Sequence, residues 1–155
     1  MTARDLIITQ FLQGTDWSNA ERAPLAGDAS MRKYQRLGAG KGGRGAVLMD
    51  ADPALGNDVA PFVRITEYLR SINLSAPEIY HADAANGLLL IEDLGDALYA
   101  RVALADPDLE RPLYEAATDV LLDLHAAPTP ALAVYDPQMM TRLASLPFDW
   151  HTPDA

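Results

Sequence analysis

The spacing of hydrophobic positions changes along the chain, and each change predicts a different element. Helical spacing occurs at residues 3–13 and again, with a clearer apolar stripe, at residues 58–73. In the second segment Asp58 and Pro61 suit the first turn, because aspartate accepts free backbone N–H groups and proline lacks one. The pattern therefore predicts two amphipathic helices in the first half of the chain.

Four other segments have the composition or the alternation of β-strands and form two predicted hairpins. They are residues 31–37 with 46–50, and residues 78–82 with 88–91. The first pair is joined by the glycine-rich segment 38–45, and the second contains Asn86-Gly87, a dipeptide typical of two-residue hairpin turns. Residues 88–91 are continuously apolar, which indicates a strand that is buried on both faces.

After residue 96 the strand pattern stops. Helices are expected near residues 97–104 and over about 109–126, ending before Pro128. The last segment, 137–155, contains large apolar side chains that need a surface to pack against: Met139, Met140, Phe148 and Trp150. The order of elements is helix, hairpin, helix, hairpin and then helices, so the expected fold class is α+β.

Composition narrows the classes of partner. The 155 residues suit one domain, or a small lobe with the beginning of a second, and the net charge of −10 argues against a nucleic-acid partner. The chain has no cysteine, which excludes a disulfide framework and a thiolate zinc site. The sequence shows no signal peptide and no apolar run long enough to span a bilayer, so we expect no membrane partner and a cytoplasmic location.

Two sequence motifs match the patterns of known sites, but the elements and spacing around them do not. Residues 38–43 satisfy the GxGxxG pattern, but a strand follows them, whereas dinucleotide binding needs the N-terminus of a helix. His81-Ala82-Asp83 resembles a kinase catalytic loop, yet Asn86 follows too soon and the triplet precedes the apolar strand. We predict a strand end and a turn there, and we name no catalytic residue and no metal ligand.

Five segments, in this order along the chain, resemble the aminoglycoside phosphotransferase family. They are residues 27–34 (GDASMRKY), 47–51 (VLMDA), 61–65 (PFVRI), 76–79 (APEI) and 89–96 (LLIEDLGD). Within that family the chain is most similar to the bacterial kinases that phosphorylate N-acetylmuramate and N-acetylglucosamine at the anomeric carbon. The resemblance covers about residue 5 to the end, and it corresponds to the N-terminal portion of such a protein.

The resemblance implies a protein-kinase-like N-lobe, with a five-stranded antiparallel sheet and an inserted helix, over residues 1–96. Residues 97–155 would form the helical beginning of a C-lobe. ATP would be bound by two groups of residues, one at the phosphates and one at the adenine edge in a hinge. The first group is Gly27, Asp28, Ser30, Arg32 and Lys33, and the second is Glu92 and Leu94.

The chain departs from the family pattern at the third strand, where kinases carry a lysine paired with a glutamate. Here the strand reads Val-Leu-Met-Asp, ending at Asp50, and has no lysine. One hypothesis is a charge-swapped pair between Asp50 and Arg64. The phosphate charge would then be met by Arg32, Lys33 or Arg36 on the second strand. The alternative is that Asp50 and Arg64 are unpaired surface charges.

The family's catalytic aspartate, its asparagine and its magnesium-binding aspartate have no counterpart after residue 126. The resemblance therefore implies an ATP- and Mg-dependent phosphotransferase that acts on an amino sugar and whose present chain is inactive by itself. The phosphate acceptor would be a small-molecule hydroxyl, and a missing C-lobe or a partner chain would cover the apolar tail. The open alternative is a non-catalytic nucleotide-binding or interaction module, similar to a pseudokinase.

Overall fold

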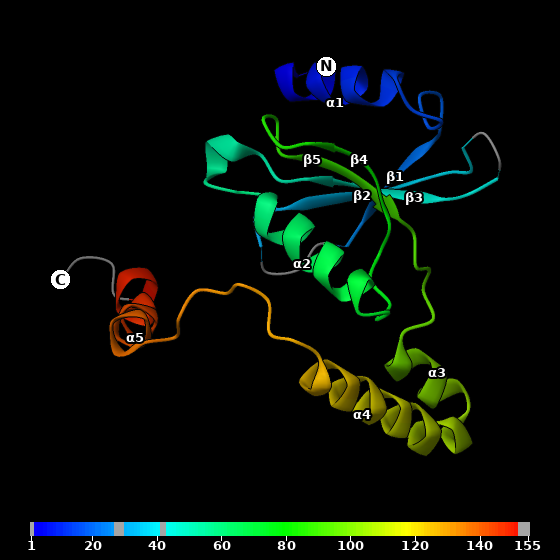
Figure 1. Ribbon diagram of the computed structural model, residues 1–155. Helices are drawn as coiled ribbons and strands as arrows, with labels where there is room; N and C mark the ends of the chain where they lie inside the picture. The colour runs from blue at the N-terminus through cyan, green and yellow to red at the C-terminus, as the bar shows by residue number, and fades with distance from the viewer. Residues whose placement is uncertain (1, 27–29, 41–42, 152–155) are drawn as a thin grey trace. The chain divides into compact units, whose positions relative to one another are not determined.

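The computed structural model describes residues 2–26, 30–40 and 43–151, and it divides into two compact units, Met1–His125 and Ala126–Ala155 (Figure 1). The elements of the first unit, in chain order, are α1 (Ala3–Gln13), β1 (Arg22–Leu25), β2 (Lys33–Leu37), β3 (Ala46–Asp50), the 3₁₀ turn η1 (Pro53–Leu55), α2 (Ala60–Ser71), β4 (Ile79–Asp83), β5 (Leu88–Glu92), α3 (Tyr99–Ala105), the 3₁₀ turn η2 (Pro107–Leu109) and α4 (Glu110–Ala126). The second unit contains α5 (Pro137–His151).

The strands form one antiparallel sheet in the order β1-β2-β3-β5-β4 within the described part of the chain. β3 lies at its centre, and all of its residues are buried. Strands β3 and β5 are apolar on both faces because each face is covered by a helix. The α+β class and the five-stranded antiparallel sheet are therefore confirmed.

Two hydrophobic cores lie on opposite faces of this sheet. Side chains alternate along a strand, so Leu48 and Leu90 face one side while Met49 and Leu89 face the other. The first side is covered by α1, through Ile8 and Leu12, and the second by α2, through Phe62 and Val63. Figure 1 shows the two helices above and below the strands. Each face of the central strands is thus closed by one helix.

The predicted boundaries agree with the structure for several elements. Helix α1 covers the predicted residues, and α2 lies inside the predicted 58–73 segment. The N-cap of α2 is Val59, which has no side-chain cap, and not Asp58 as predicted; the carboxylate of Asp58 accepts the N–H of Ala60 at 2.8 Å. No helix in the described ranges is long and apolar enough to cross a membrane.

The hydrophobic pattern missed or misplaced three features. Strand β1 was not predicted, because it is a short edge strand whose residues are mostly exposed and which contains Pro24. Helix α5 was not predicted, and it contains Pro147 in its interior. The turn at Asn86-Gly87 was expected to have two residues. The register pairs Asp83 with Leu88, so the loop has four, 84–87.

Candidate functional site

The register of the central strands places the predicted site residues at two ends of the sheet. Glu92 pairs with Ala46 at one end of β3, and Lys33 pairs with Asp50 at the other. The two pairs are separated by four residues of strand, roughly 13 Å at ~3.3 Å per residue. Lys33 and Glu92 therefore cannot bind the same small group, but they can lie near the two ends of an elongated ligand.

The predicted hinge, residues 91–94, lies at the end of β5, and residues 92–96 are named the hinge segment. Its backbone begins with groups that already form hydrogen bonds to the sheet. The N–H of Glu92 donates to the carbonyl of Glu78 at 2.8 Å, and the carboxylate of Glu92 accepts the N–H of Glu78 at 3.0 Å. Leu94, in contrast, is 61% exposed, and its N–H has no hydrogen-bond partner among the described residues. Of these two residues, Leu94 is the one that has a free backbone donor.

The hinge segment is held by a guanidinium group from β2. Arg36 forms hydrogen bonds to both carboxylate oxygens of Asp96, at 2.6 and 3.1 Å. Its Nε and Nη2 atoms lie 2.7 and 3.1 Å from the two oxygens of Asp93. The hydrogen bond from Arg36 lowers the pKa of Asp96, and the two aspartates raise the pKa of Arg36. Arg36 is therefore already paired with two carboxylates, through three hydrogen bonds from its Nη atoms and an ion-pair contact from Nε.

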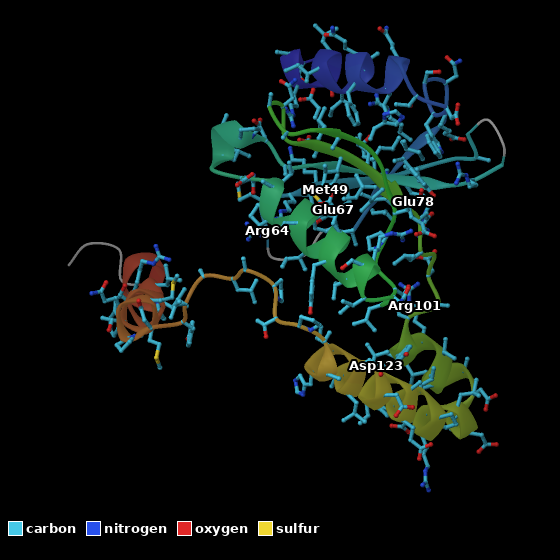
Figure 2. The ribbon with its side chains drawn as sticks, in the orientation of Figure 1. Met49, Arg64, Glu67, Glu78, Arg101 and Asp123 are labelled. Carbon is cyan, nitrogen blue, oxygen red and sulfur yellow. The ribbon has the colours of Figure 1, made fainter. Side chains whose placement is uncertain are left out.

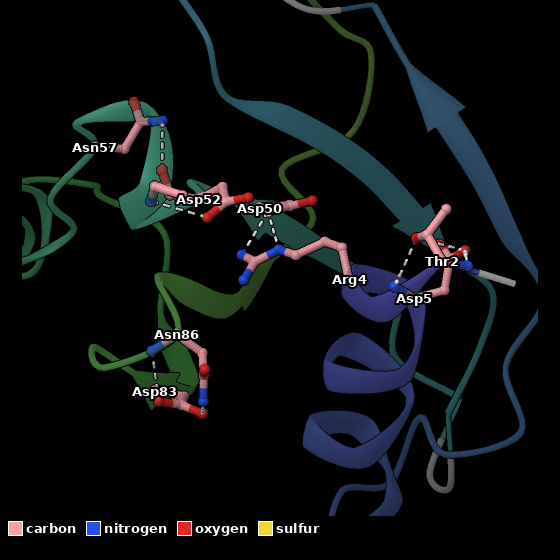
Figure 3. A network of polar contacts seen from close by, with 9 residues as sticks. Thr2, Arg4, Asp5, Asp50, Asp52, Asn57, Asp83 and Asn86 are labelled. Carbon is pink, nitrogen blue, oxygen red and sulfur yellow. Dashed lines mark hydrogen bonds and ion pairs between the residues drawn. The ribbon is translucent and has the colours of Figure 1, made fainter.

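At the far end of β3, Asp50 is paired with α1 rather than with α2 (Figure 3). Its Oδ1 accepts hydrogen bonds from Arg4 Nε at 3.0 Å and from Arg4 Nη2 at 2.6 Å. The hypothesis of an Asp50–Arg64 pair is wrong, because side chains alternate along β3 and Asp50 points to the face that α1 covers. The alternative, that Asp50 and Arg64 are both unpaired surface charges, is wrong for Asp50, which pairs with Arg4; Arg64 is exposed and has no ion pair among the described residues.

The residues of β3 that face α2 carry no charge. Met49 faces α2 and is completely buried in the core formed with Phe62 and Val63. Arg64 and Glu67 are carried by α2 and are exposed (Figure 2). A buried methionine packs the helix against the strand by apolar contact and cannot contact a phosphate by charge.

The residues predicted for the phosphates are only partly described. Gly27 and Asp28 lie outside the described residues. The N–H of Arg32 donates to the hydroxyl of Ser30 at 3.3 Å, so these two residues form one local turn. Lys33 is exposed, and its pairing with Asp50 places it on the α1 face of the sheet. The structure thus brings Ser30 and Arg32 together and places Lys33 on the face opposite Met49.

The triplet at residues 81–83 has the structural role that its context predicted. His81 is exposed on β4, and the carboxylate of Asp83 accepts hydrogen bonds from Asn86 Nδ2 at 2.7 Å and from the Asn86 N–H at 3.1 Å. Figure 3 shows this closed turn. These hydrogen bonds lower the pKa of Asp83. Asp83 closes a hairpin and does not belong to a catalytic loop.

Comparison with known proteins identifies the family. The sequence profile of the phosphotransferase enzyme family matches residues 21–153, which include the whole sheet and the helices after it. The chain belongs to this family. No group of three or more histidine, aspartate or glutamate side chains that could hold a metal occurs in the residues that the structure describes.

Similar proteins include three bacterial kinases, each named N-acetylmuramate/N-acetylglucosamine kinase. The protein of Caulobacter vibrioides is 38% identical over 86% of this chain and 43% of its own length. The protein of Pseudomonas aeruginosa is 35% identical over 85% of this chain and 38% of its own length. The protein of Neisseria meningitidis is 29% identical over 81% of this chain and 37% of its own length. The chain therefore spans about two fifths of the length of these relatives.

Sequence reasoning missed the role of Arg36. It counted this residue among three possible phosphate ligands, because a basic cluster on a strand suits an anion. The signal against that role was present in the two aspartates of the sequence DLGD, at 93 and 96. It could not be interpreted without the fold, since Arg36 and Asp96 are 60 residues apart in sequence.

Proposed function

We propose that the protein is an ATP-dependent amino-sugar kinase in which this chain forms the nucleotide-binding lobe. The observation that carries the proposal is the family match over residues 21–153, together with three relatives that are all named as kinases of N-acetylated amino sugars. The family supports phosphoryl transfer as the reaction. The names of the relatives support the amino sugar as its acceptor.

The geometry of the sheet is compatible with an extended nucleotide. A free N–H at Leu94 can donate to the edge of an adenine, and the neighbouring apolar strand supplies a surface for its ring. The carbonyl of Glu92 would accept from the same edge, since its N–H is already used by Glu78. The opposite end of the strands, where Arg32 and the turn before it lie, would then face the phosphates.

The phosphate end depends on Ser30 and Arg32 in the described part of the chain, with Gly27 and Asp28 as further proposed contacts. A phosphate contact by Lys33 is also proposed, and its side chain would have to reach the phosphates around the edge of the sheet from the α1 face. Bound MgATP supplies the transferred phosphoryl group, and these residues would hold it in one orientation. The described residues do not fit a complete magnesium site, and we derive no step through the metal.

The test is a phosphoryl-transfer assay on the protein that contains this chain. ATP is supplied with N-acetylmuramate, N-acetylglucosamine or kanamycin as the acceptor, and transfer of the γ-phosphate is measured. We expect transfer to the two amino sugars and none to kanamycin. Transfer to kanamycin alone would contradict the amino-sugar assignment, and no transfer to any of the three would contradict the proposed reaction.

A second candidate, a nucleotide-binding module without chemistry, is favoured by one observation, the absence of a lysine from β3, whose α2 face is buried and apolar at Met49. The same assay separates the two if it is combined with a titration of the 155-residue chain by MgATP. A rise in melting temperature with ATP but no transfer by the protein would favour the module. Binding together with transfer would exclude it.

A further inference from the structure

The hinge segment is built as a small, fixed loop. Asp93 Oδ1 accepts the N–H of Gly95 at 2.9 Å, which closes a tight turn around Leu94. Gly95 has a φ of 78°, in the left-handed region that favours glycine, and the carbonyl of Asp96 accepts the N–H of Leu98 at 2.8 Å. The turn thus leaves Leu94 at its outside, between two aspartates that point back to the sheet.

Arg36 binds both of these aspartates and so fixes the two ends of the turn. Its planar guanidinium meets each carboxylate through two nitrogen–oxygen contacts of 2.6–3.1 Å. The side chain of Asp93 also packs 3.4 Å from the position that a β-carbon on Gly45 would occupy, so the clamp sits close against β3. A lysine could not form the same four contacts, because its ammonium group is a single point charge.

We propose that Arg36 is a positioning residue for the nucleobase: by clamping Asp93 and Asp96, it presents the free N–H of Leu94 to the adenine edge. This inference rests on the proposed function. It assigns Arg36 to the base end of the nucleotide, in place of the phosphate end that the sequence suggested. Both Nη atoms of the guanidinium donate to these carboxylates and Nε lies 2.7 Å from Asp93, so its charge is already paired at the hinge segment.

The two roles predict different results with two ligands. A residue that positions the hinge affects adenosine and ATP by the same factor, whereas a phosphate ligand affects ATP and leaves adenosine unchanged. We therefore measure the dissociation constants of both ligands for the wild-type chain and for Arg36→Ala, by calorimetry. The expected result is about tenfold weaker binding of both, the scale of losing charge-assisted hydrogen bonds. Arg36→Lys should recover only part of the loss.

The matched control is Arg111→Ala, which removes an arginine whose partner, Glu115, lies on the same exposed helix. It should leave both dissociation constants unchanged. Amide hydrogen exchange adds a readout that needs no ligand, since unlocking the hinge should speed exchange of the Gly95 N–H. Should Arg36→Ala not fold, Asp96→Asn carries the same comparison, because Asp96 is exposed and the change removes one charge of the clamp.

The outcomes separate the inference from the function on which it rests. Weaker binding of ATP by Arg36→Ala, with unchanged binding of adenosine, would overturn the positioning role and restore Arg36 as a phosphate ligand. Unchanged binding of both ligands by the variant, or unchanged exchange at Gly95, would overturn the clamp. Failure of the wild-type chain to bind either ligand would overturn the nucleotide site itself, and the inference with it.

Discussion

Arg4 and Asp50 join the first helix to the end of the central strand through a short ion pair, with Nη2 and Oδ1 2.6 Å apart. Asp50 is 8% exposed, and Arg4 reaches it from α1 with two of its nitrogen atoms (Figure 3). The pair closes the α1 face of the sheet at the end where Lys33 also lies. It therefore links the packing of α1 to the strand nearest the candidate site.

Arg4→Ala should destabilise the fold by about 2 kcal/mol, because it leaves a mostly buried carboxylate without its partner. The value lies between the ~0.5 kcal/mol of exposed pairs and the ~3–5 kcal/mol of fully buried ones. Urea unfolding measures it. The double variant Arg4→Ala with Asp50→Asn should recover part of the loss, since the amide is neutral. A loss below ~0.5 kcal/mol in the single variant would show that the pair is fully screened.

Gly40→Ala should destabilise the hairpin between β2 and β3. A β-carbon there would lie 2.9 Å from ring atoms of Trp17, which is 3% exposed and stacks on Tyr80 at a centroid distance of 5.0 Å. The ring cannot withdraw without breaking this stack, so we expect a cost of about 1–3 kcal/mol. Urea unfolding monitored by tryptophan fluorescence measures this loss of stability.

Gly14→Ala is the matched control for this change, because a β-carbon at Gly14 meets no atom within 4 Å and its φ is −85°. Its stability should change by no more than about 0.5 kcal/mol. Equal effects of the two substitutions would mean that the Trp17 contact does not limit residue 40.

Gly87→Ala should be more destabilising than Gly56→Ala. Both glycines have left-handed backbones, with φ of 64° and 76°, so each substitution costs about 1–2 kcal/mol in strain. A β-carbon at Gly87 would also collide with the carbonyl of Ala51, whereas one at Gly56 meets nothing within 4 Å. Comparison of the two melting temperatures isolates the collision. Similar values would indicate that the β4–β5 turn can move away from β3.

Stability should decrease in acid partly because of Asp83. Its pKa in the folded state is lowered from 3.8 by the hydrogen bonds from Asn86. The stabilisation is therefore fully present above the unfolded value and is lost as the pH falls through the folded one. Melting temperatures between about pH 5 and pH 2 should decline less steeply in Asp83→Asn. Asn86→Ala should give the same flattening, because it removes the donors. If the decline of melting temperature with pH is as steep in both variants as in the wild type, this assignment to Asp83 is contradicted.

Local patterns were enough to predict the elements that carry their own signals. The 3.6-residue spacing gave α1 and α2, and the apolar run at 88–91 gave a strand buried on both faces. The order of the predicted elements indicated the α+β class, and the resemblance of five sequence segments indicated the family. Strand β1 and helix α5 were not predicted. An exposed edge strand with a proline and a helix with an internal proline have weak hydrophobic periodicity.

The pairing of charges was decided only by the tertiary structure. The sequence shows that Asp50 and Arg36 are charged residues on neighbouring strands, and it suggests Arg64 and a phosphate as their partners. Strand alternation turns Asp50 toward α1 and Arg4, and the sheet register brings Arg36 beside Asp93 and Asp96. Ion pairs form between groups that the fold brings within a few ångströms. A linear sequence does not contain that distance, so the sequence determined the lobe and the fold determined which of its charges remain free for a ligand.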